Sequence, residues 1–443
     1  MSNPRRTFLK TLSSSALATA AMNPSTAFAR STTRPPSDQV NIAVVGVNSI
    51  GWANLQSHLR VPGVKCVALC DVDQRVLNRR IADTEKITGY RPKGYTDFRK
   101  LYEHPDLDAV VLGTPDHWHA LQTIYACRAG LDVYVEKPLA NSIEECRVIA
   151  DAVKKYGRVV QVGQQQRSST HWQPAMKRIR DGELGRVNFV RAWNHSGVDR
   201  IVQPKPDQAA PAEVDYKMWL GPAPERPFNE NRFHGSFRWY WDYAGGKMTD
   251  WGVHLIDMVL LGMDAAAPNA VIAAGGKFAD PDSAMETPDT MSATYEFDDF
   301  IMVWEHNMLN PTGPYDKDHG IEFVGEKGRM VIDRRGWEIF PVMQRADDGT
   351  ERYAMEKMPY QPRTGDPRDA HAQNFVDCIK SREQPVCPIE IGSNVAVVAH
   401  LGNIAYRLGR KIYWDKAAGT FKDDSDAEAM VAAQYHNGWK LSV

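Results

Sequence analysis

Short apolar runs alternate with longer segments of mixed polarity along the first part of the chain. The apolar runs are rich in β-branched residues and have the length of buried parallel strands, and the segments between them are long enough for helices. The predicted strands are residues 41–46, 65–71, 109–114, 132–137 and 159–163. The predicted helices include residues 97–104, 119–129 and 142–156. Such a series predicts an α/β fold with a doubly wound, mostly parallel sheet.

The pattern changes beyond residue 163, where short strands follow one another with turns between them. These strands are predicted at residues 186–194, 271–278, 290–297, 301–306, 320–324 and 329–332. Consecutive short strands favour antiparallel pairing, so we expect an α+β domain with a largely antiparallel, open-faced sheet. The two patterns divide the chain into a first domain at residues 40–163 and a second at residues 164–443. A length of 443 residues is consistent with two domains.

Composition and charge narrow the choice of partners. Hydrophobic residues make up 43% of the chain and charged residues 24%, as in ordinary globular proteins, and the net charge is -2. There is neither a basic excess nor a block of like charges, so we expect no nucleic-acid partner. No segment combines the length and the apolarity of a membrane span, so we expect no spanning helix.

The first residues have the features of an export signal. The run Arg5-Arg6-Thr7-Phe8-Leu9-Lys10 precedes a mildly apolar stretch at residues 11–22, and Ala27-Phe28-Ala29 offers small residues to a signal peptidase. This segment resembles a twin-arginine signal. We therefore expect a signal peptide at residues 1–29, a linker at residues 30–39, and a periplasmic or secreted mature protein. A basic tail without a targeting role is the alternative.

The six cysteines show no metal-ligand spacing. Cys66 and Cys70 lie four residues apart on a predicted strand, about 13 Å by strand rise, which is too far for a disulfide. We interpret most of the thiols as buried and leave a Cys378–Cys387 disulfide open.

A glycine-containing loop after the first predicted strand indicates a dinucleotide site, as in a Rossmann-type sheet. The residues of this loop expected to bind the cofactor are Gly46, Asn48, Ser49, Ile50 and Gly51. Asn48 replaces the usual second glycine, and asparagine tolerates left-handed backbone dihedrals better than most residues. Asp71 ends the next predicted strand, where a carboxylate would bind ribose hydroxyls and repel a 2′-phosphate. NAD is therefore favoured over NADP, although an aspartate that only caps a helix is the alternative.

A lysine stands at the end of another predicted strand. The apolar run at residues 132–135 stops at Glu136-Lys137-Pro138. Because open α/β sheets bind ligands at the carboxyl ends of their strands, Lys137 is expected beside the cofactor.

The segments 113–119 (Gly-Thr-Pro-Asp-His-Trp-His), 129–130 (Ala-Gly) and 135–138 (Val-Glu-Lys-Pro) together resemble the Gfo/Idh/MocA oxidoreductases. That resemblance extends from about residue 40 to the end of the chain. It implies that the nicotinamide side is lined by Thr114, Pro115, His117 and His119. It also implies that Glu136 and Lys137 lie where the cofactor meets the substrate.

A second polar group follows Gly245-Gly246 on a predicted helix. Asp250 and His254 are four residues apart and therefore share one face, with Asp257 a turn further on. A histidine suits the removal of a hydroxyl proton, and a nearby lysine can stabilise the developing alkoxide. The family resemblance implies that His254 is the general base and that Lys137 and Asp250 hold and polarise the hydroxyl. An ordinary Asp–His pair on an exposed helix is the alternative.

Substrate contacts are predicted at Lys137, Gln166, Arg167, Trp241, Asp250 and His254. A zinc site is an alternative interpretation of these residues, because His117 with His119, or Asp250 with His254 and Asp257, could ligate the metal. No nearby Cys or His completes either set, so we expect no metal.

The leading hypothesis is an exported NAD-dependent oxidoreductase that acts on a secondary hydroxyl of a sugar, cyclitol or glycoside. Little free NAD is available outside the cytoplasm, so the cofactor should be tightly bound and recycled. A redox-assisted glycoside hydrolase with a 3-keto intermediate is the alternative, although the intact Glu-Lys-Pro departs from the N-acetylgalactosaminidase branch. A noncatalytic sugar sensor is the third reading. Relatives suggest a homo-oligomer through the antiparallel sheet.

Overall fold

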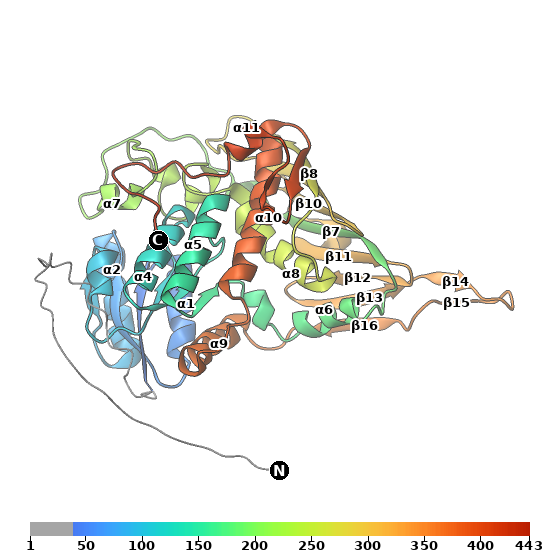
Figure 1. The fold of residues 1–443 in the computed structure, drawn as a ribbon, viewed down its shortest axis with the longest axis horizontal. Coiled ribbons are helices and arrows are strands. Elements are labelled where there is room, and N and C mark those ends of the chain that lie inside the picture. Colours follow the sequence, from blue (N-terminus) through green and yellow to red (C-terminus); the bar gives the residue numbers. More distant parts are fainter. Residues whose placement is uncertain (1–38) are drawn as a thin grey trace, which may run out of the picture. The chain divides into compact units, whose positions relative to one another are not determined.

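The structure is a computed structural model that describes residues 39–443. The predicted signal peptide at residues 1–29, and all but the last residue of the predicted linker, lie outside the described residues. The described residues form two main sheets with helices packed against them (Figure 1). Within residues 39–443, no helix is both long and apolar enough to cross a membrane.

The first sheet has six parallel strands in the order β3-β2-β1-β4-β5-β6. Every residue of the strands β1, β4, β5 and β6 is buried, as expected for a parallel sheet covered on both faces. The strands are β1 (Val40–Val45), β2 (Val64–Cys70), β3 (Lys93–Tyr95), β4 (Ala109–Leu112), β5 (Asp132–Val135) and β6 (Val160–Val162).

Helices cover both faces of this sheet, which confirms the doubly wound prediction. One layer holds α1 (Ser49–Leu59), α2 (Gln74–Thr88) and α9 (Pro367–Ser381). The other holds α3 (Phe98–Tyr102), α4 (Asp116–Arg128) and α5 (Ile143–Tyr156). Phe375 and Val376 of α9 pack with Leu55 of α1. A helix from the last fifth of the chain therefore completes a layer that the strand pattern assigns to residues 40–163.

The second sheet has ten strands in the order β16-β13-β12-β11-β7-β10-β9-β8-β17-β18. The strands β7 and β10 pair in parallel and the other pairs are antiparallel, which confirms the largely antiparallel prediction. Its strands are β7 (Val187–His195), β8 (Ala270–Gly276), β9 (Thr290–Glu296), β10 (Ile301–Asn307), β11 (His319–Gly325), β12 (Gly328–Ile332), β13 (Gly336–Pro341), β16 (Met358–Pro362), β17 (Ile412–Asp415) and β18 (Thr420–Phe421).

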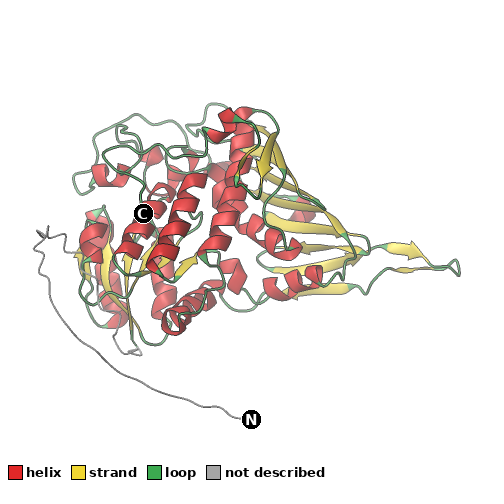
Figure 2. Cartoon of the chain, viewed as in Figure 1, coloured by secondary structure: helices red, strands yellow, loops and turns green. Residues whose placement is uncertain are grey.

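One face of the second sheet is covered by α6 (Trp172–Arg180), α8 (Val253–Met263) and α10 (Ile389–Leu408), as Figure 2 shows. Alternate residues of β10 are buried, and those between them are half-buried, so the opposite face is more open. Separate short elements are the hairpin of β14 (Met343–Arg345) and β15 (Glu351–Tyr353), and the helices α7 (Tyr216–Leu220) and α11 (Ser425–Glu428).

The predicted strands and helices recur with boundaries shifted by a few residues, but β3 and β13 to β18 have no counterpart in the predictions. The strands β3, β14 and β15 are three residues long, and β14 and β15 are fully exposed, so they carry no apolar alternation.

All six thiols are buried and free, so Cys378 and Cys387 do not form a disulfide.

Candidate active site

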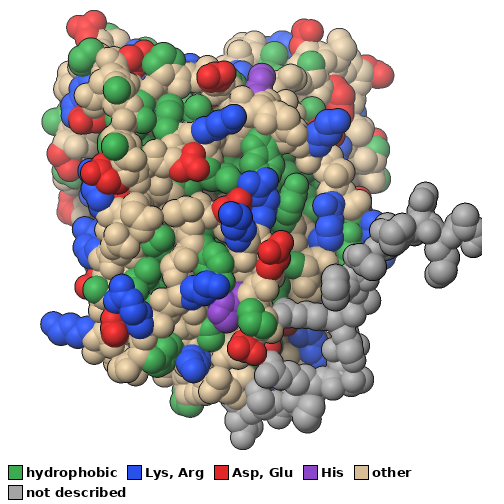
Figure 3. Space-filling model, turned by 90° about the vertical axis from the view of Figure 1, so that its left-hand side faces the viewer, with side chains coloured by type: hydrophobic (Ala, Val, Ile, Leu, Met, Phe, Trp, Pro, Cys, Tyr) green, Lys and Arg blue, Asp and Glu red, His purple; other side chains and the backbone are tan. Residues whose placement is uncertain are grey.

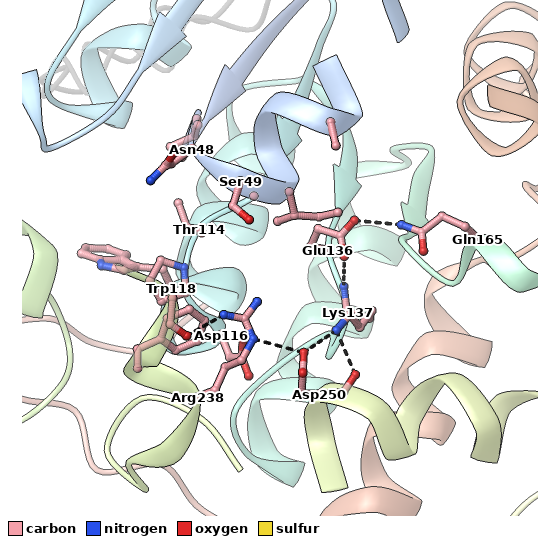
Figure 4. Close-up of a pocket in the computed structure, with 18 of the residues that line it drawn as sticks. Asn48, Ser49, Thr114, Asp116, Trp118, Glu136, Lys137, Gln165, Arg238 and Asp250 are labelled. Carbon is pink, nitrogen blue, oxygen red and sulfur yellow. Dashed lines mark hydrogen bonds and ion pairs between the residues drawn. The ribbon is translucent and has the colours of Figure 1, made fainter. Parts of the chain in front are cut away.

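A cavity of about 560 Å³ opens where the strands of the parallel sheet end and where α8 begins. Gly46, Ser49 and Asp71 line one end, and Trp251 and His254 line the other. Lys137 and Asp250 lie between the two ends (Figure 4). The space-filling view of one face of the molecule shows Lys and Arg side chains interspersed with Asp and Glu side chains (Figure 3).

The loop between β1 and α1 needs its two outer glycines for steric reasons. Gly46 has φ +75°, and a Cβ there would lie 2.8 Å from the backbone nitrogen of Thr114. A Cβ on Gly51 would overlap the carbonyl oxygen of Gly46, and a Cβ on Gly113 would lie 2.6 Å from the Cα of Gly51. The backbones of the loop and of the β4 end therefore touch directly, and together they form a glycine cradle open to the cavity.

The middle of this loop differs from the expectation. Asn48 is extended, with φ -90° and ψ 167°, so it does not use the left-handed conformation expected of it. Ser49 has the positive φ, +39°. Asn48 precedes α1 without a capping hydrogen bond from its side chain. The Gly51 N–H donates to the Asn48 carbonyl oxygen at 3.0 Å, whereas the N–H groups of Ser49 and Ile50, which line the cavity, are available to an anionic group there.

Asp71 lies directly after β2 and lines the same end of the cavity. Its Oδ2 accepts a hydrogen bond from the Val47 N–H at 2.9 Å, and its Oδ1 accepts one from the Asp73 N–H at 3.0 Å. Burial raises the pKa of Asp71, while these two backbone N–H groups lower it. The bonds fix the carboxylate at the rim of the cradle, where it can accept ribose hydroxyls.

The segment after β4 divides into residues that face the cavity and residues that support it. Thr114 and Pro115 line the cavity. The ring nitrogens of His119 lie 2.9 Å and 2.7 Å from the carbonyl oxygens of Thr114 and Pro138, so this side chain joins the two loops from behind. His117 lies 3.1 Å from the carbonyl oxygen of Trp219. Neither histidine lines the cavity, so the geometry gives both a supporting position and no direct contact with a cofactor there.

Glu136 is buried at the floor of the cavity, where several hydrogen bonds surround its carboxylate. Its Oε1 accepts bonds from Asn54 Nδ2 at 2.8 Å and from Gln165 Nε2 at 2.9 Å, and its Oε2 accepts one from the Lys137 N–H at 3.2 Å. Burial raises the pKa of Glu136, while Lys137 lowers it. Glu136 therefore ties α1 and the segment after β6 to the strand end that carries Lys137.

Lys137, Asp250 and Arg238 form an ion-pair chain across the cavity (Figure 4). Lys137 Nζ donates to Asp250 Oδ1 at 2.8 Å and to the Asp250 carbonyl oxygen at 2.9 Å. Arg238 Nε donates to the same Oδ1 at 3.2 Å. These two cations hold the pKa of Asp250 far below its usual range despite burial. Asp250 therefore stays ionised and orients the lysine.

Asp116 is a second buried carboxyl group of the cavity wall, and the sequence analysis assigned it no role. It is the first residue of α4 and is 6% exposed. Burial raises the pKa of Asp116 to about 8, against the opposing effects of Arg238 and Lys137. Near neutral pH this group is therefore largely protonated and can donate a hydrogen bond.

His254 does not share an ordinary α-helical face with Asp250. Residues Met248–Gly252 form a π-helical turn, and α8 starts at Val253, so the expected one-turn spacing is altered. Among the described residues, no hydrogen-bond partner reaches the buried Nδ1 of His254. Burial, followed by Arg334 and Lys137, lowers the pKa of His254 well below its usual value. The imidazole is therefore neutral and can accept a proton.

Gln166 supports the histidine from the segment after β6. Its Nε2 donates to the His254 carbonyl oxygen at 3.1 Å, and its Oε1 accepts from Arg334 Nε at 3.0 Å. Gln166, His254 and Arg334 all line the cavity. The predicted substrate residue Gln166 thus lies at the expected end of the cavity.

The structure does not bring Arg167 and Trp241 to this cavity. Arg167 is paired with the fully buried Asp257, with its Nη2 2.6 Å from Asp257 Oδ1. Trp241 donates from Nε1 to the Glu286 carbonyl oxygen at 3.1 Å and lines a separate, much smaller cavity. We therefore assign structural roles to both residues that were predicted to contact the sugar, because their polar groups already bond to Asp257 and to Glu286.

Several residues that line the cavity were not predicted from the sequence. Trp251 and Asp116 lie inside the motifs that indicated this site, so those motifs could have identified them. Arg238 lies in the short 3-10 helix His234–Trp239 and Arg334 in a turn, neither of them within a motif, and only the fold brings them to the cavity. In residues 39–443, no group of three or more His, Cys, Asp or Glu side chains is placed to hold a metal ion.

The residues at the glycine end fit a dinucleotide. Close backbone contacts of Gly46, Gly51 and Gly113 hold the loop against the end of β4, and Gly46, Ser49, Ile50 and Gly113 line the space that a pyrophosphate would occupy. Asp71 provides the carboxylate for ribose hydroxyls. The nicotinamide end of such a ligand would approach Thr114, Glu136 and Lys137.

Comparison with known protein families agrees with this architecture. Residues 40–164 match an oxidoreductase family with an NAD-binding Rossmann fold. Residues 185–318 and 355–441 match the C-terminal α/β domain of the same family. Together the two matches include most of the cavity lining, but not the segment that carries Gln165 and Gln166 or the turn that carries Arg334.

Curated relatives are similar over different lengths. A glycosyl hydrolase family 109 protein of Shewanella is 33% identical over 125 residues, which are 27% of each chain. An alpha-N-acetylgalactosaminidase of Shewanella oneidensis is 31% identical over the same length. The match therefore spans about a quarter of these relatives. An uncharacterised oxidoreductase of Bacillus subtilis, YrbE, is 22% identical over 84% of this chain and 96% of its own length.

Solved structures share the fold at low identity. The WlbA dehydrogenase of Bordetella pertussis, in complex with NADH and UDP-GlcNAcA, has a TM-score of 0.62 and 18% identity, covering 85% of this chain and 99% of its own. A levoglucosan dehydrogenase in complex with NADH and levoglucosan has a TM-score of 0.63 and 18% identity at the same coverage. With both of its domains matched, the chain belongs to the Gfo/Idh/MocA oxidoreductase family, with NAD as the cofactor of its first domain.

Proposed function

We propose that the protein is an exported, NAD-dependent oxidoreductase that oxidises a secondary hydroxyl of a sugar, cyclitol or glycoside and retains its NAD between turnovers. The observation that carries the proposal is the convergence of Lys137, Asp250 and His254 on the cavity that also contains the glycine cradle. A noncatalytic sugar sensor would have no use for a buried ion pair beside an unpartnered imidazole.

Each of these side chains has a separate role in the proposed alcohol oxidation. NAD bound in the cradle supplies the hydride acceptor. His254 accepts the hydroxyl proton on its neutral imidazole. Lys137 stabilises the developing alkoxide charge, because its ammonium is held by two oxygens of Asp250 and keeps a third N–H for the substrate.

Export and cofactor retention belong together in this proposal. The Arg5-Arg6 segment resembles a signal that carries folded proteins across the membrane, with their cofactor inside. A cofactor that left the protein outside the cytoplasm would not be replaced. The proposed cycle therefore reoxidises the bound cofactor with a second sugar or with the product of the first half-reaction.

A redox-assisted glycoside hydrolase is the second candidate, and the similarity to glycosyl hydrolase family 109 proteins over 125 residues favours it. In that chemistry, oxidation at C3 acidifies the C2 proton, elimination expels the aglycone, water adds, and the hydride returns. The net reaction is hydrolysis. His254 and the largely protonated Asp116 are the groups of the cavity that can take and give protons in such steps.

Two measurements on the exported protein test these proposals. Denaturation should release NAD, and sugars added to the native protein should reduce that NAD in a single turnover without dissociating it. A glycoside whose aglycone is released, with C2 deuterium incorporated from heavy water and no lasting reduction, selects the hydrolase. A protein that neither contains nor binds NAD would overturn both candidates.

A further inference from the structure

Three arginines converge on the end of the cavity that holds His254. Arg334 lies in the turn between β12 and β13, Arg363 directly follows β16, and Arg368 is in the first turn of α9. All three line the cavity. Within residues 39–443, none of their side chains forms an ion pair with a carboxylate. Unpaired guanidinium groups that face one cavity need an explanation.

Arg334 is held in place by contacts that leave its terminal amino groups unused. Its Nε donates to Gln166 Oε1 at 3.0 Å, and its guanidinium lies 4.3 Å from the ring centre of Trp251. The Trp251 ring is 6.2 Å from the ring of His254. Trp251 therefore separates the proposed base from a fixed cation by one aromatic ring.

The other two arginines are positioned by their backbones. The Arg363 N–H donates to the Arg335 carbonyl oxygen at 2.7 Å, which joins the end of β16 to the turn that carries Arg334. The Arg368 N–H donates to Asp366 Oδ1 at 3.0 Å at the start of α9. The pKa of Arg334 is lowered to about 10 by burial together with Arg368 and Arg363, against the opposing effect of Asp250. Arg363 and Arg368 are thus each close enough to Arg334 to repel it.

Most carboxylates near this end of the cavity are paired with other cations. Asp333 accepts from Lys317 at 3.2 Å and from Arg335 at 3.1 Å, and Asp318 pairs with Arg335. Asp366 lines the cavity and caps α9 through the Arg368 N–H, so its one negative charge offsets part of the charge of the three arginines. Asp250 is shared by Lys137 and Arg238. The arginine cluster therefore retains a surplus of positive charge, which an anionic ligand group would neutralise.

We propose that Arg334, Arg363 and Arg368 form an anion subsite, and that the substrate is a sugar or glycoside carrying a carboxylate or a sulfate ester. This inference rests on the proposed function and specifies its substrate class. The acidic group binds the arginine cluster, and a neutral hydroxyl of the same molecule faces Lys137 and His254. Guanidinium groups suit both acids, because their N–H groups can contact two oxygens at once.

Sulfate binding to the NAD-loaded protein tests the subsite without any reaction. Calorimetric titration with sodium sulfate, at ionic strength matched with sodium chloride, should show saturable binding. Arg334→Gln, Arg363→Gln and Arg368→Gln should each weaken it about 10-fold, because each replacement removes a charged hydrogen-bond donor from the subsite. Arg345→Gln in the exposed β14–β15 hairpin is the matched control. The exposed Arg363 and Arg368 keep the test valid if Arg334→Gln does not fold.

A second measurement decides the substrate class. The acidic sugars are methyl glucuronide, methyl galacturonide, and the 6-sulfates of methyl glucoside and methyl galactoside. The neutral sugars are methyl glucoside and methyl galactoside themselves. Both groups are compared by single-turnover reduction of bound NAD. Acidic members should react with at least about 10-fold higher kcat/KM, a preference that Arg368→Gln removes. Equal reaction of acidic and neutral members would overturn this inference and leave the oxidoreductase in place. If no sugar reacts, the sulfate titration still decides: no saturable binding, or binding unchanged in the arginine variants, contradicts the subsite.

Discussion

The ammonium group of Lys137 is held by two oxygens of one residue, Asp250. Its Nζ lies 2.8 Å from the carboxylate Oδ1 and 2.9 Å from the carbonyl oxygen of that aspartate, 113 positions along the chain. An ammonium group has three N–H donors, so one remains for a ligand in the cavity. This remaining N–H donor suits the site to binding an alcohol oxygen.

Replacement of Lys137 by Met should slow hydride transfer by about 100-fold to 1,000-fold, because a donor to the developing oxyanion is lost. The bound NAD should remain, since the cradle is unaffected. The rate is measured by single-turnover reduction of the bound cofactor and its content by extraction. Lys411→Met, which removes a half-buried lysine paired with Glu296 away from the cavity, is the matched control. Near wild-type turnover in Lys137→Met would refute the role assigned to this lysine.

Replacement of His254 by Asn should lower the same rate by about 100-fold or more, the usual contribution of a general base. The neutral imidazole acts as base, so added imidazole should restore part of the activity of His254→Asn and none of that of Lys137→Met. Circular dichroism and retained NAD serve as checks of folding. An unchanged pH–rate profile in His254→Asn would contradict the assignment.

Replacement of Asp71 by Ser should change cofactor selectivity. The carboxylate that accepts ribose hydroxyls is lost and so is its repulsion of a 2′-phosphate. Affinity for NAD should fall about 10-fold, and the preference for NAD over NADP should narrow by a similar factor. Competitive titration of the cofactor-free protein with the two nucleotides measures both effects. A preference that is retained in full would place the discrimination elsewhere in the loop.

Arg167→Met separates a structural role from a substrate contact. Asp257 is 0% exposed and pairs with Arg167, so removal of the arginine alone leaves a buried charge and should lower the free energy of unfolding by about 3–5 kcal/mol. The double variant Arg167→Met with Asp257→Leu should recover much of this loss. Urea denaturation measures the stabilities. A raised KM at unchanged stability would instead restore Arg167 as a substrate residue.

Acid should destabilise the protein through buried histidines at the contact of α1 with α9. Burial lowers the pKa of both His58 and His371 to about 4, from an ordinary value of 6.5. The unfolded chain therefore binds more protons below pH 6.5, and stability falls as the pH drops toward 4. Each histidine should contribute about 2 kcal/mol of loss between pH 7 and about pH 5. The double variant His58→Asn, His371→Asn should show a shallower fall in Tm over that range, and an equal slope would contradict the prediction.

Much of the fold followed from local patterns. The apolar runs of the parallel sheet and the alternation in β10 depend on which residues can be buried. The positions of Gly46 and Gly51 depend on close backbone contacts that leave no space for a side chain. These are properties of short segments, so sequence reasoning could recover them. It failed for α9, because packing against α1 rather than against the second sheet is decided by contacts across more than three hundred residues.

The same distinction between local patterns and long-range contacts applies to the candidate site. The residues Lys137, Asp250 and His254, and the choice of NAD, came from motifs in the sequence. The conformation of Asn48, the placement of Arg167 and Trp241 away from the cavity, and the presence of Arg238 and Arg334 in its lining did not. A motif identifies a residue type at a position, whereas the partner of a charged side chain depends on which other segments are folded beside it.

Periodicity and turn geometry act over a few residues, so the two kinds of sheet, the family and the residues that can perform the chemistry were predictable from the amino-acid order. How those residues are used depends on the contacts that the folded chain brings together. Burial sets which groups are charged, and the π-helical turn at Met248–Gly252 directs Asp250 to Lys137 and leaves His254 unpaired. Electrostatic environment is a property of the folded chain, and here it distinguishes the proposed base His254, the oriented Lys137 and, among the described residues, the three arginines without an ion pair.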